Sequence, residues 1–236
     1  INTNMSKPGE SISREKYNKY DFAVIATDVV IFTVKDEELQ ILLIKMNKEP
    51  YSESWAFPGG LVDPTESVDE SAERHLHEKT GVKDVYLEQL YTFGKIDRDP
   101  FGRVVSVAYM ALIPSETYDL RTTAEYGEVG WFPVKDNPSL AYDHEEVLSV
   151  ACDRLKAKLG YTNIVYSLLP EEFTFSDLRH IYEIILDKDL DKRNFRRKIE
   201  SLDIIAEVLG KKRRGAHRPA QVYRFKKREP QVVEIL

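Results

Sequence analysis

A cluster of charged and titratable residues between positions 66 and 79 is the part of this chain best suited to chemistry. His75, Glu78 and Lys79 are three and four residues apart, so a helix would place their side chains on one face. Several carboxylates on such a face could hold Mg²⁺, a hard cation that takes oxygen ligands and substrate phosphates. Here one carboxylate stands beside an imidazole and an ammonium, and the ammonium repels a divalent cation. We therefore expect no metal and no catalytic residue, and Lys79 could instead supply positive charge to an anionic ligand.

Strands and helices alternate around this cluster. Its own helix is expected at about residues 67–80, with Gly81 in the position of a C-cap. A β-hairpin is expected around Asp36-Glu37-Glu38, and apolar residues recur at helical spacing over residues 144–159. The predicted strands cover residues 22–33, 39–46, 85–95, 103–113 and 129–134. These elements predict one α/β domain over residues 21–160, preceded by a flexible polar arm over residues 1–20.

The pattern changes near residues 160–163, where a second domain covering residues 161–236 is expected to begin. Thr174-Phe175-Ser176 offers a helix start, and Asp191 is placed to cap a second helix over about residues 192–202. Two short helices joined by a turn, with a basic exposed face on the second, predict a helix-turn-helix. The strand-like segments 204–209 and 221–225 flank a basic, glycine-bordered tip, as in the wing of a winged helix.

This arrangement predicts binding to double-stranded DNA. Arg193, Asn194 and Arg197 are expected to contact base edges in the major groove, and the wing is expected to contact phosphates. RNA is a less favoured partner, because single-strand recognition uses aromatic stacking platforms and this face has none. The residues expected to contact DNA are Lys192, Arg193, Asn194, Arg196, Arg197, Lys198, Lys211, Lys212, Arg213, Arg214, His217 and Arg218.

The distribution of charge supports an anionic partner for the second domain. The chain carries a net charge of −6, yet residues 192–228 hold 14 basic and 3 acidic side chains. Cys152 is the single cysteine, which excludes an intrachain disulfide or a thiolate zinc site and fits a reducing compartment. No apolar run approaches the roughly 18 residues of a membrane span, and no signal peptide is recognisable. We expect a cytoplasmic protein that does not enter the membrane.

The cluster around residue 75 resembles the Nudix box of diphosphate hydrolases. The box has the pattern G, five residues, E, seven residues, R-E-U-x-E-E-x-G-U, in which U is a bulky apolar residue. His75 and Lys79 stand where the box has glutamates. The residues that match at the right spacing are Gly60, Glu66, Arg74, Leu76, Glu78, Gly81 and Val82. The resemblance implies an α/β/α sandwich, and the two departures imply a pocket that binds without cleaving.

The whole layout resembles the NrtR family, the Nudix-related transcriptional regulators. Besides the altered box, the resemblance rests on residues 94–100, 103–106 and 191–197. It implies a dimeric repressor that binds a palindromic operator and is released by ADP-ribose or a related nucleotide, without a cofactor. A sugar-responsive branch that includes the arabinose regulator AraR shares this layout, so a pentose is the alternative effector.

Two other functions are compatible with the sequence. One is an active nucleoside-diphosphate hydrolase with ligands elsewhere, such as Glu128. The other is a DNA-binding protein whose Nudix-like domain is only a dimerisation scaffold. Two candidates for effector binding also have competing structural roles: Arg74 could pair with Glu66 or Glu78, and Arg98 could pair with Asp97 or Asp99. His144 is expected to start a helix rather than to bind a metal. The residues expected to bind the effector are Trp55, Phe57, Glu66, Arg74, Glu78, Lys79, Asp97 and Arg98.

Overall fold

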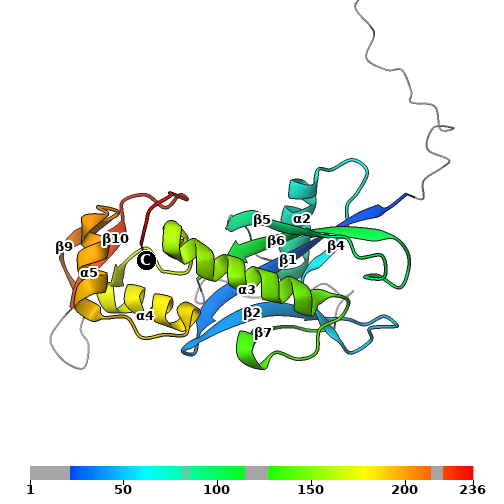
Figure 1. Ribbon diagram of the computed structural model, residues 1–236, viewed down its shortest axis with the longest axis horizontal. Helices are drawn as coiled ribbons and strands as arrows, with labels where there is room; N and C mark the ends of the chain where they lie inside the picture. The colour runs from blue at the N-terminus through cyan, green and yellow to red at the C-terminus, as the bar shows by residue number, and fades with distance from the viewer. Residues whose placement is uncertain (1–21, 82, 84, 115–126, 214–219, 236) are drawn as a thin grey trace, which may run out of the picture.

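The computed structural model describes residues 22–81, 83, 85–114, 127–213 and 220–235, without the side chains of residues 79, 80 and 211–213. A seven-stranded sheet with its helices lies at one end of the elongated molecule, and a smaller domain with a three-stranded sheet lies at the other (Figure 1). The predicted arm at residues 1–20 and the box residue Val82 lie outside the described residues.

The long strand β1 organises the larger sheet. β1 runs parallel to β6 from the Val24–Val104 pair to the Phe32–Leu112 pair. The strand order is β3-β2-β1-β6-β5, with β4 paired to β1 and β7 paired to β2. The strands are β1 (Val24–Lys35), β2 (Glu38–Lys45), β3 (Trp55–Ala56), β4 (Gly59–Leu61), β5 (Tyr86–Phe93), β6 (Val104–Leu112) and β7 (Val129–Pro133). The five predicted strands are therefore confirmed, and the short strands β3 and β4 were not predicted.

The predicted hairpin is confirmed, with a shorter turn than expected. Asp36 and Glu37 have φ angles of 51° and 64°, the left-handed values that a two-residue hairpin turn requires. Glu38 already belongs to β2 and pairs with Lys35. The turn therefore ends one residue earlier than the run of acidic residues suggested.

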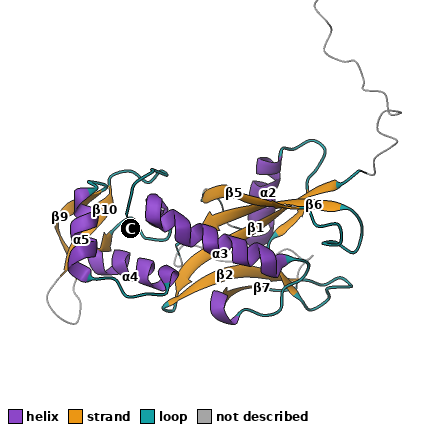
Figure 2. Cartoon of the chain, in the orientation of Figure 1, coloured by secondary structure: helices purple, strands orange, loops and turns teal. Residues whose placement is uncertain are grey.

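One helix covers each face of the larger sheet, and β1 between them is therefore buried on both sides (Figure 2). Val29 and Ile31 point toward α2 (Val68–Thr80), where they pack with Ala72 and Leu76. Val30 and Phe32 point to the opposite face, where α3 (His144–Tyr161) supplies its buried residues. Those residues of α3 are Val147, Leu148, Ala151, Leu155 and Leu159. The expected α/β/α sandwich is confirmed.

Both ends of α2 follow from its sequence. The side chain of Ser67 accepts a hydrogen bond from the amide of Glu70, and the side chain of Glu70 accepts one from the amide of Ser67. This reciprocal capping box satisfies amides that the first turn leaves unpaired. Gly81 ends the helix with a φ angle of 75°, which favours glycine. The helix that carries the box is thus positioned by the residues that flank it.

The second domain contains the predicted pair of helices and the wing strands. Thr174 and Asp191 cap the two helices with their side chains, and Asp191 accepts from the amide of Asn194. The strand order in the small sheet is β8-β10-β9. The elements after β7 are η1 (Val134–Asp136), α3, η2 (Ile164–Ser167), β8 (Phe173–Thr174), α4 (Phe175–Leu186), α5 (Lys192–Ser201), β9 (Ile205–Arg213) and β10 (Ala220–Phe225). This is a winged helix, as predicted.

The two domains are joined through α3 and through the end of the chain. α3 continues to Tyr161, and the backbone of Thr162 forms a bridge with Val232. The fully buried Asn163 accepts a 2.7 Å hydrogen bond from the amide of Gln231. One apolar cluster continues from Leu159 of α3 to Leu178 and Tyr182 of α4. In the part of the chain that the structure describes, no helix combines the length and apolarity needed to cross a membrane.

Candidate ligand cavity and nucleic-acid interface

Arg74 ties together the acidic residues of the box. Its Nε donates to Glu66 Oε2 over 2.8 Å and its Nη2 to Glu66 Oε1 over 2.5 Å, a bidentate pair. Its Nη1 lies 3.3 Å from Glu78 Oε2. The Arg74 hydrogen bonds, together with one from the amide of Asp63, lower the pKa of Glu66 to about 2. The pairing role considered for Arg74 is therefore real, and its single positive charge is shared between the two carboxylates.

His75 points into the protein. Its side chain is buried, and its Nε2 lies 3.2 Å from the carbonyl oxygen of Leu61. A Cβ on Gly60 would lie 2.7 Å from His75 Cε1, so the ring needs a glycine there. Glu78 is half exposed. The expected single ligand-binding face is therefore divided between a buried imidazole and an exposed carboxylate, while the Lys79 side chain lies outside the described residues.

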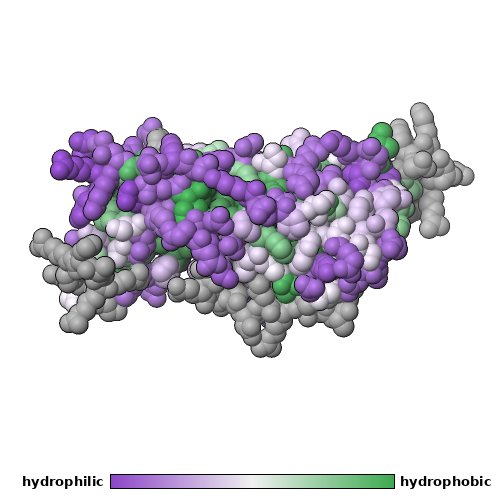
Figure 3. Space-filling view, turned by 90° about the horizontal axis from the view of Figure 1, so that it is seen from below, coloured by the Kyte–Doolittle hydropathy of each residue, from purple (hydrophilic) through white to green (hydrophobic). Residues whose placement is uncertain are grey.

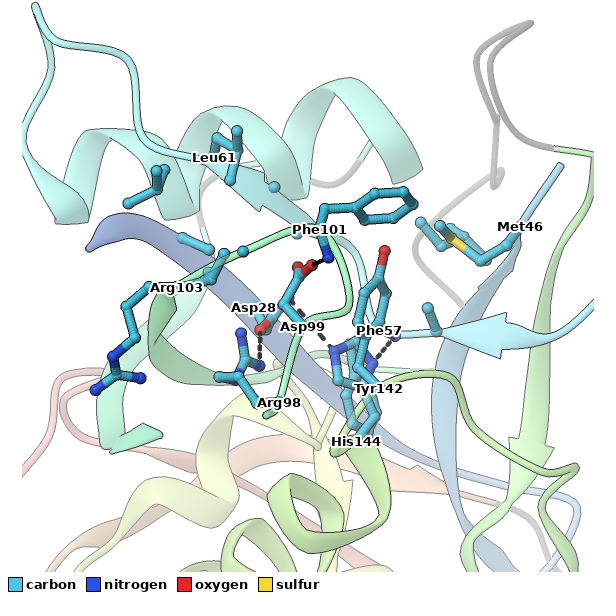
Figure 4. Close-up of a pocket in the computed structure, with 18 residues that line it drawn as sticks. Asp28, Met46, Phe57, Leu61, Arg98, Asp99, Phe101, Arg103, Tyr142 and His144 are labelled. Atoms are coloured by element: carbon cyan, nitrogen blue, oxygen red, sulfur yellow. Dashed lines mark hydrogen bonds and ion pairs between the residues drawn. The ribbon is translucent and has the colours of Figure 1, made fainter. Parts of the chain in front are cut away.

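One cavity near the larger sheet is not lined by the box helix. This cavity, of about 440 Å³, opens beside β4, where Gly60 and Leu61 form part of its wall (Figure 4). The strands β1, β2 and β6, the segment after β5 and the start of α3 contribute the rest. Its lining residues are Val24, Ala26, Asp28, Ile44, Met46, Ala56, Phe57, Gly59, Gly60, Leu61, Arg98, Asp99, Phe101, Gly102, Arg103, Val104, Tyr142 and His144.

A buried carboxylate, Asp28, forms the polar floor of the cavity. Ser106 Oγ donates to Asp28 Oδ2 over 2.6 Å, and Arg98 Nη2 lies 3.4 Å from the same oxygen. Burial by itself raises the pKa of Asp28, but the nearby His144, Ser106 and Arg98 hold this pKa well below its usual range. Asp28 is therefore a charged acceptor at the bottom of a largely apolar cavity.

His144 is oriented by hydrogen bonding on one side and by Asp28 on the other. The amide of Phe57 donates to His144 Nδ1 over 3.0 Å, so the neutral ring carries its proton on Nε2. His144 Nε2 lies 3.6 Å from Asp28 Oδ1. The Phe57 ring stacks on the imidazole at a centroid distance of 5.1 Å. His144 does start α3, as expected, but the sequence analysis did not place it in a cavity.

Arg98 connects the cavity to the residue before α3. Its Nε and Nη2 donate to the two carboxylate oxygens of Asp143 over 3.0 Å and 2.7 Å. The exposed fractions of the Arg98 and Asp143 side chains are 3% and 10%. The sequence suggested a pair with a neighbouring aspartate, Asp97 or Asp99. This expectation is wrong, because the partners Asp28 and Asp143 are brought to Arg98 by β1 and by the α3 N-terminus.

Aromatic side chains surround the mouth of the cavity. Phe101 is largely exposed, and its amide donates to Asp99 Oδ1 over 2.8 Å. Tyr142 contacts Tyr51 with tilted rings whose centroids are 4.3 Å apart, and burial raises the pKa of Tyr142 to about 12. Phe101, Tyr142 and Met46 face the same opening (Figure 4). The arrangement offers apolar rings near the entrance and charged groups below.

The predicted effector residues are divided by the fold. Phe57 and Arg98 line the cavity, whereas Trp55 packs edge-on against Phe132 with ring centroids 4.5 Å apart. Asp97 is exposed and outside the cavity lining. The sequence analysis missed Asp28, Tyr142 and His144. Asp28 had a usable signal, because it is an acidic residue within an otherwise apolar strand.

The box residues Glu66, Arg74 and Glu78 also lie outside the lining of this cavity. Glu128, the alternative metal ligand, is exposed and 3.4 Å from Lys45 Nζ. Among the described residues, no group of three or more His, Cys, Asp or Glu side chains is arranged to hold a metal ion.

The recognition helix α5 presents polar side chains to solvent. Arg197 Nη2 donates to Asn194 Oδ1 over 2.9 Å, which fixes two of the expected base-reading groups relative to each other. Lys192, Arg193, Asn194 and Arg197 are exposed, while Phe195 and Ile199 anchor the opposite face. The end of the molecule that carries α5 is strongly hydrophilic (Figure 3). This surface suits an anionic partner.

Arg196 has partners inside the domain. Its Nε donates to Glu200 Oε1 over 2.8 Å, and its Nη2 donates to the hydroxyl of Tyr223 over 3.1 Å. Its guanidinium lies 4.8 Å from the centre of the Phe175 ring. Arg196 thus links α5 to α4 and β10. The wing side chains of Lys211, Lys212 and Arg213, and residues Arg214, His217 and Arg218, lie outside the described residues.

Comparison with known proteins agrees with this architecture. The family model described as NUDIX domain matches residues 24–150, and the model described as NrtR DNA-binding winged helix domain matches residues 165–225. A relative from Acinetobacter baylyi, an ADPR responsive transcriptional repressor named NtrR, is 37% identical over 230 residues. The match covers 95% of this chain and 91% of that relative.

Two solved structures from Shewanella oneidensis are also similar. The crystal structure of NrtR complexed with a 27mer DNA has a TM-score of 0.77 and 35% identity, covering 86% of this chain and 93% of that one. The NUDIX domain of NrtR complexed with ADP ribose has a TM-score of 0.54 and 32% identity, covering 61% of this chain and 99% of that one. The chain therefore belongs to the NrtR family, in which a Nudix domain is joined to a winged-helix DNA-binding domain.

Proposed function

We propose that this protein is a DNA-binding transcriptional repressor that ADP-ribose releases from its operator. The observation that carries the proposal is the presence, in one chain, of a charged Nudix-domain cavity and an exposed basic recognition helix. The Acinetobacter relative is named as an ADPR-responsive repressor, and the Shewanella relative was crystallised with DNA and with ADP ribose. We place the protein in the cytoplasm, where bacterial DNA lies.

The chemistry of the cavity supports a nucleotide that carries both hydroxyls and phosphates. Asp28 is an ionised acceptor suited to sugar hydroxyls, and Arg98 is a donor suited to phosphate oxygens. Phe57, Tyr142 and Phe101 offer ring faces and edges for a base. A volume of about 440 Å³ lies in the range of ligand pockets, and the aromatic mouth would be left unused by a lone pentose. ADP-ribose is therefore preferred to arabinose.

The DNA-binding mode follows from the exposed face of α5. Arg193, Asn194 and Arg197 would read base edges, and the basic wing would contact phosphates. In a homodimer the two recognition helices would meet major grooves about 34 Å apart, or a multiple of it, on a palindromic operator. ADP-ribose would release DNA by favouring a dimer with another spacing.

We further propose that the Nudix domain senses ADP-ribose without hydrolysing it at enzymatic rates. Arg74 pairs with Glu66 and lies 3.3 Å from Glu78, and His75 is buried against Gly60. Metal-assisted hydrolysis requires a cation that activates water, and these box residues offer little free negative charge for one. Incubation of the protein with ADP-ribose and Mg²⁺ or Mn²⁺ tests this. Turnover within the ordinary enzyme range of about 1–10³ per second would overturn it.

A gel-shift experiment tests the regulator. Purified protein should retard a duplex from its own upstream region but not a scrambled duplex of the same composition. ADP-ribose should reverse the shift, and arabinose should not. Reversal by arabinose instead would identify the sugar-responsive function. Retardation that neither compound changes would favour the scaffold function.

A further inference from the structure

The first turn of α3 is attached to the cavity at two consecutive residues. Asp143 precedes the helix and accepts both hydrogen bonds of the Arg98 fork. His144 is the first helical residue and is held between the amide of Phe57 and the carboxylate of Asp28. The Arg98–Asp143 pair is almost fully buried, so removing one partner would change the balance of charge among Asp28, Arg98 and Asp143. The start of α3 therefore depends on the charge state of the cavity.

The last turn of α3 belongs to the junction with the winged helix. The carbonyl oxygen of Gly160 accepts from the amide of Ile235 over 2.8 Å, and that of Tyr161 accepts from Val233 over 2.9 Å. The next residues lead directly into η2 and the DNA-binding domain. A helix of 18 residues is about 27 Å long. One rigid element thus connects the effector cavity to the DNA-binding half (Figure 1).

The C-terminal half of α3 carries polar contacts that would serve as a pivot. Arg154 Nη2 donates to the carbonyl oxygen of Leu90 over 3.0 Å, and Lys158 pairs with Glu88. Both partners lie on β5. A displacement of the first turn would therefore rotate the last turn about these contacts, because packed helices move as units.

We propose that Asp143 is the positioning residue that transmits cavity occupancy to the winged helix. The inference rests on the proposed function, in which a diphosphate enters the cavity. Contacts among the described residues use Nε and Nη2 of Arg98, which leaves Nη1 for a ligand. A phosphate group binds the same planar fork as a carboxylate and competes with Asp143 for it. When Arg98 turns to the ligand, the first turn of α3 is released and the DNA-binding domain leaves its operator-binding orientation.

The substitution Asp143→Asn tests the proposal, because Asp143 is outside the cavity lining. Asparagine is nearly isosteric and favoured at helix starts, but it carries no charge to hold Arg98. The variant should resemble the ligand-bound state, so it should bind operator DNA weakly even without ADP-ribose. Because DNA and ADP-ribose favour opposite states, its ADP-ribose affinity should rise as its DNA affinity falls, by up to the roughly 5- to 150-fold typical of such coupling. ADP-ribose affinity is measured by calorimetry and operator affinity by fluorescence anisotropy.

Two further variants complete the experiment. Asp143→Ser removes the pairing group altogether, keeps a residue favoured before a helix, and should show the same two changes. Asp153→Asn removes the same charge from an exposed position of α3 and should change neither affinity. Tighter ADP-ribose binding separates coupling from structural damage, which would weaken both affinities.

ADP-ribose affinity that stays unchanged or falls in both Asp143 variants would overturn the role of Asp143. The proposed function is judged separately on the unsubstituted protein. If that protein fails to bind ADP-ribose, or binds it without releasing DNA, the proposed function is wrong whatever the variants do.

Discussion

At the scale of single residues, the charged side chains of the Nudix box form ion pairs with one another. The Glu66 carboxylate accepts hydrogen bonds from Nε and Nη2 of Arg74 and from the amide of Asp63. The same guanidinium reaches Glu78. The box has therefore kept the residues that shape its loop and helix, which explains why its spacing is recognisable in a chain that we propose to be a sensor. The identity of the effector-contacting residues stays a prediction.

The Glu66–Arg74 pair makes the free energy of unfolding depend on pH. The pKa of Glu66 lies at about 2 in the folded protein, below its ordinary value of 4.5. Its contribution to the free energy of unfolding is therefore complete above pH 4.5 and is lost as the pH falls toward 2. Glu66→Gln should be less stable than the unsubstituted protein at pH 7, and this difference should shrink over that window. Urea midpoints measured at pH 7, 4.5 and 3 check this, and a constant difference would contradict it.

Gly59 gives a second prediction at this scale. A Cβ there would lie 2.3 Å from Asp28 Oδ1 and 2.4 Å from the carbonyl oxygen of Thr27, so the backbone of β4 would have to shift. Gly59→Ala should lower the free energy of unfolding by about 1–3 kcal/mol and weaken ADP-ribose binding. Gly160→Ala is the matched control, because nothing lies within 4 Å of its added Cβ. Equal effects of the two substitutions in urea melts and calorimetry would contradict the steric argument.

At the scale of elements, α5 has an exposed face for DNA and a second face for its own domain. The sequence placed Arg193 and Arg196 together on the basic side of the helix. The structure separates them, because Arg196 is bound to Glu200, Tyr223 and Phe175. Charge alone could not distinguish the two arginines, since the partners of Arg196 on α4 and β10 are brought to it only by the fold. The expected contact of Arg196 with DNA stays untested.

Alanine substitutions of Arg193 and Arg196 should therefore change different properties of the protein. Arg193→Ala should leave the urea midpoint almost unchanged and reduce discrimination at one operator position by about 1–3 kcal/mol. Arg196→Ala should lower the free energy of unfolding, with the cation–π contact contributing about 0.5–1 kcal/mol. Operator and single-base variants, titrated by fluorescence anisotropy alongside the melts, separate the two effects. Equal changes in stability and in base discrimination for the two variants would contradict these separate roles.

At the scale of the whole molecule, one apolar cluster extends from the large sheet across α3 into the winged helix. Asn163 strengthens this junction, because its fully buried amide binds Glu229 and Gln231 near the end of the described chain. A shared core and a hydrogen-bonded junction favour a rigid connection between the Nudix domain and the winged helix. Such rigidity is what a coupling helix requires if a displacement at its first turn is to reach the DNA-binding domain.

The shared core predicts cooperative unfolding of the two domains. Trp55 and Trp131 are the two tryptophans of the chain, and both lie in the Nudix domain. Tryptophan fluorescence should therefore report the Nudix domain while far-UV circular dichroism reports both domains, and the two urea transitions should coincide. Asn163→Ala should lower the common midpoint by an amount that corresponds to about 1–3 kcal/mol. Separate transitions in the unsubstituted protein would show that the domains unfold independently.

The sequence by itself determined the local features of this protein. The box spacing, the caps at Gly81, Thr174 and Asp191, the turn at Asp36 and Glu37, and the apolar periodicities specified elements that the structure confirms. Each of these signals lies within a few residues of the element it specifies, because capping and helical periodicity act over one or two turns. The family and the winged-helix architecture could therefore be predicted from the sequence.

Only the tertiary structure decided the composition of the cavity. Asp28, Arg98 and His144 come from β1, from the segment after β5 and from the start of α3, and they meet because β1 pairs in parallel with β6. The contacts of Asp28 with Arg98 and His144 span 70 and 116 positions of the chain, and no local pattern encodes such a distance. Of the side chains that the sequence favoured as ligand contacts, Phe57 and Arg98 line the cavity, whereas Trp55 is partly buried against the core and Asp97 is exposed. The tertiary fold thus determined which charged side chains are buried in ion pairs and which remain at the surface.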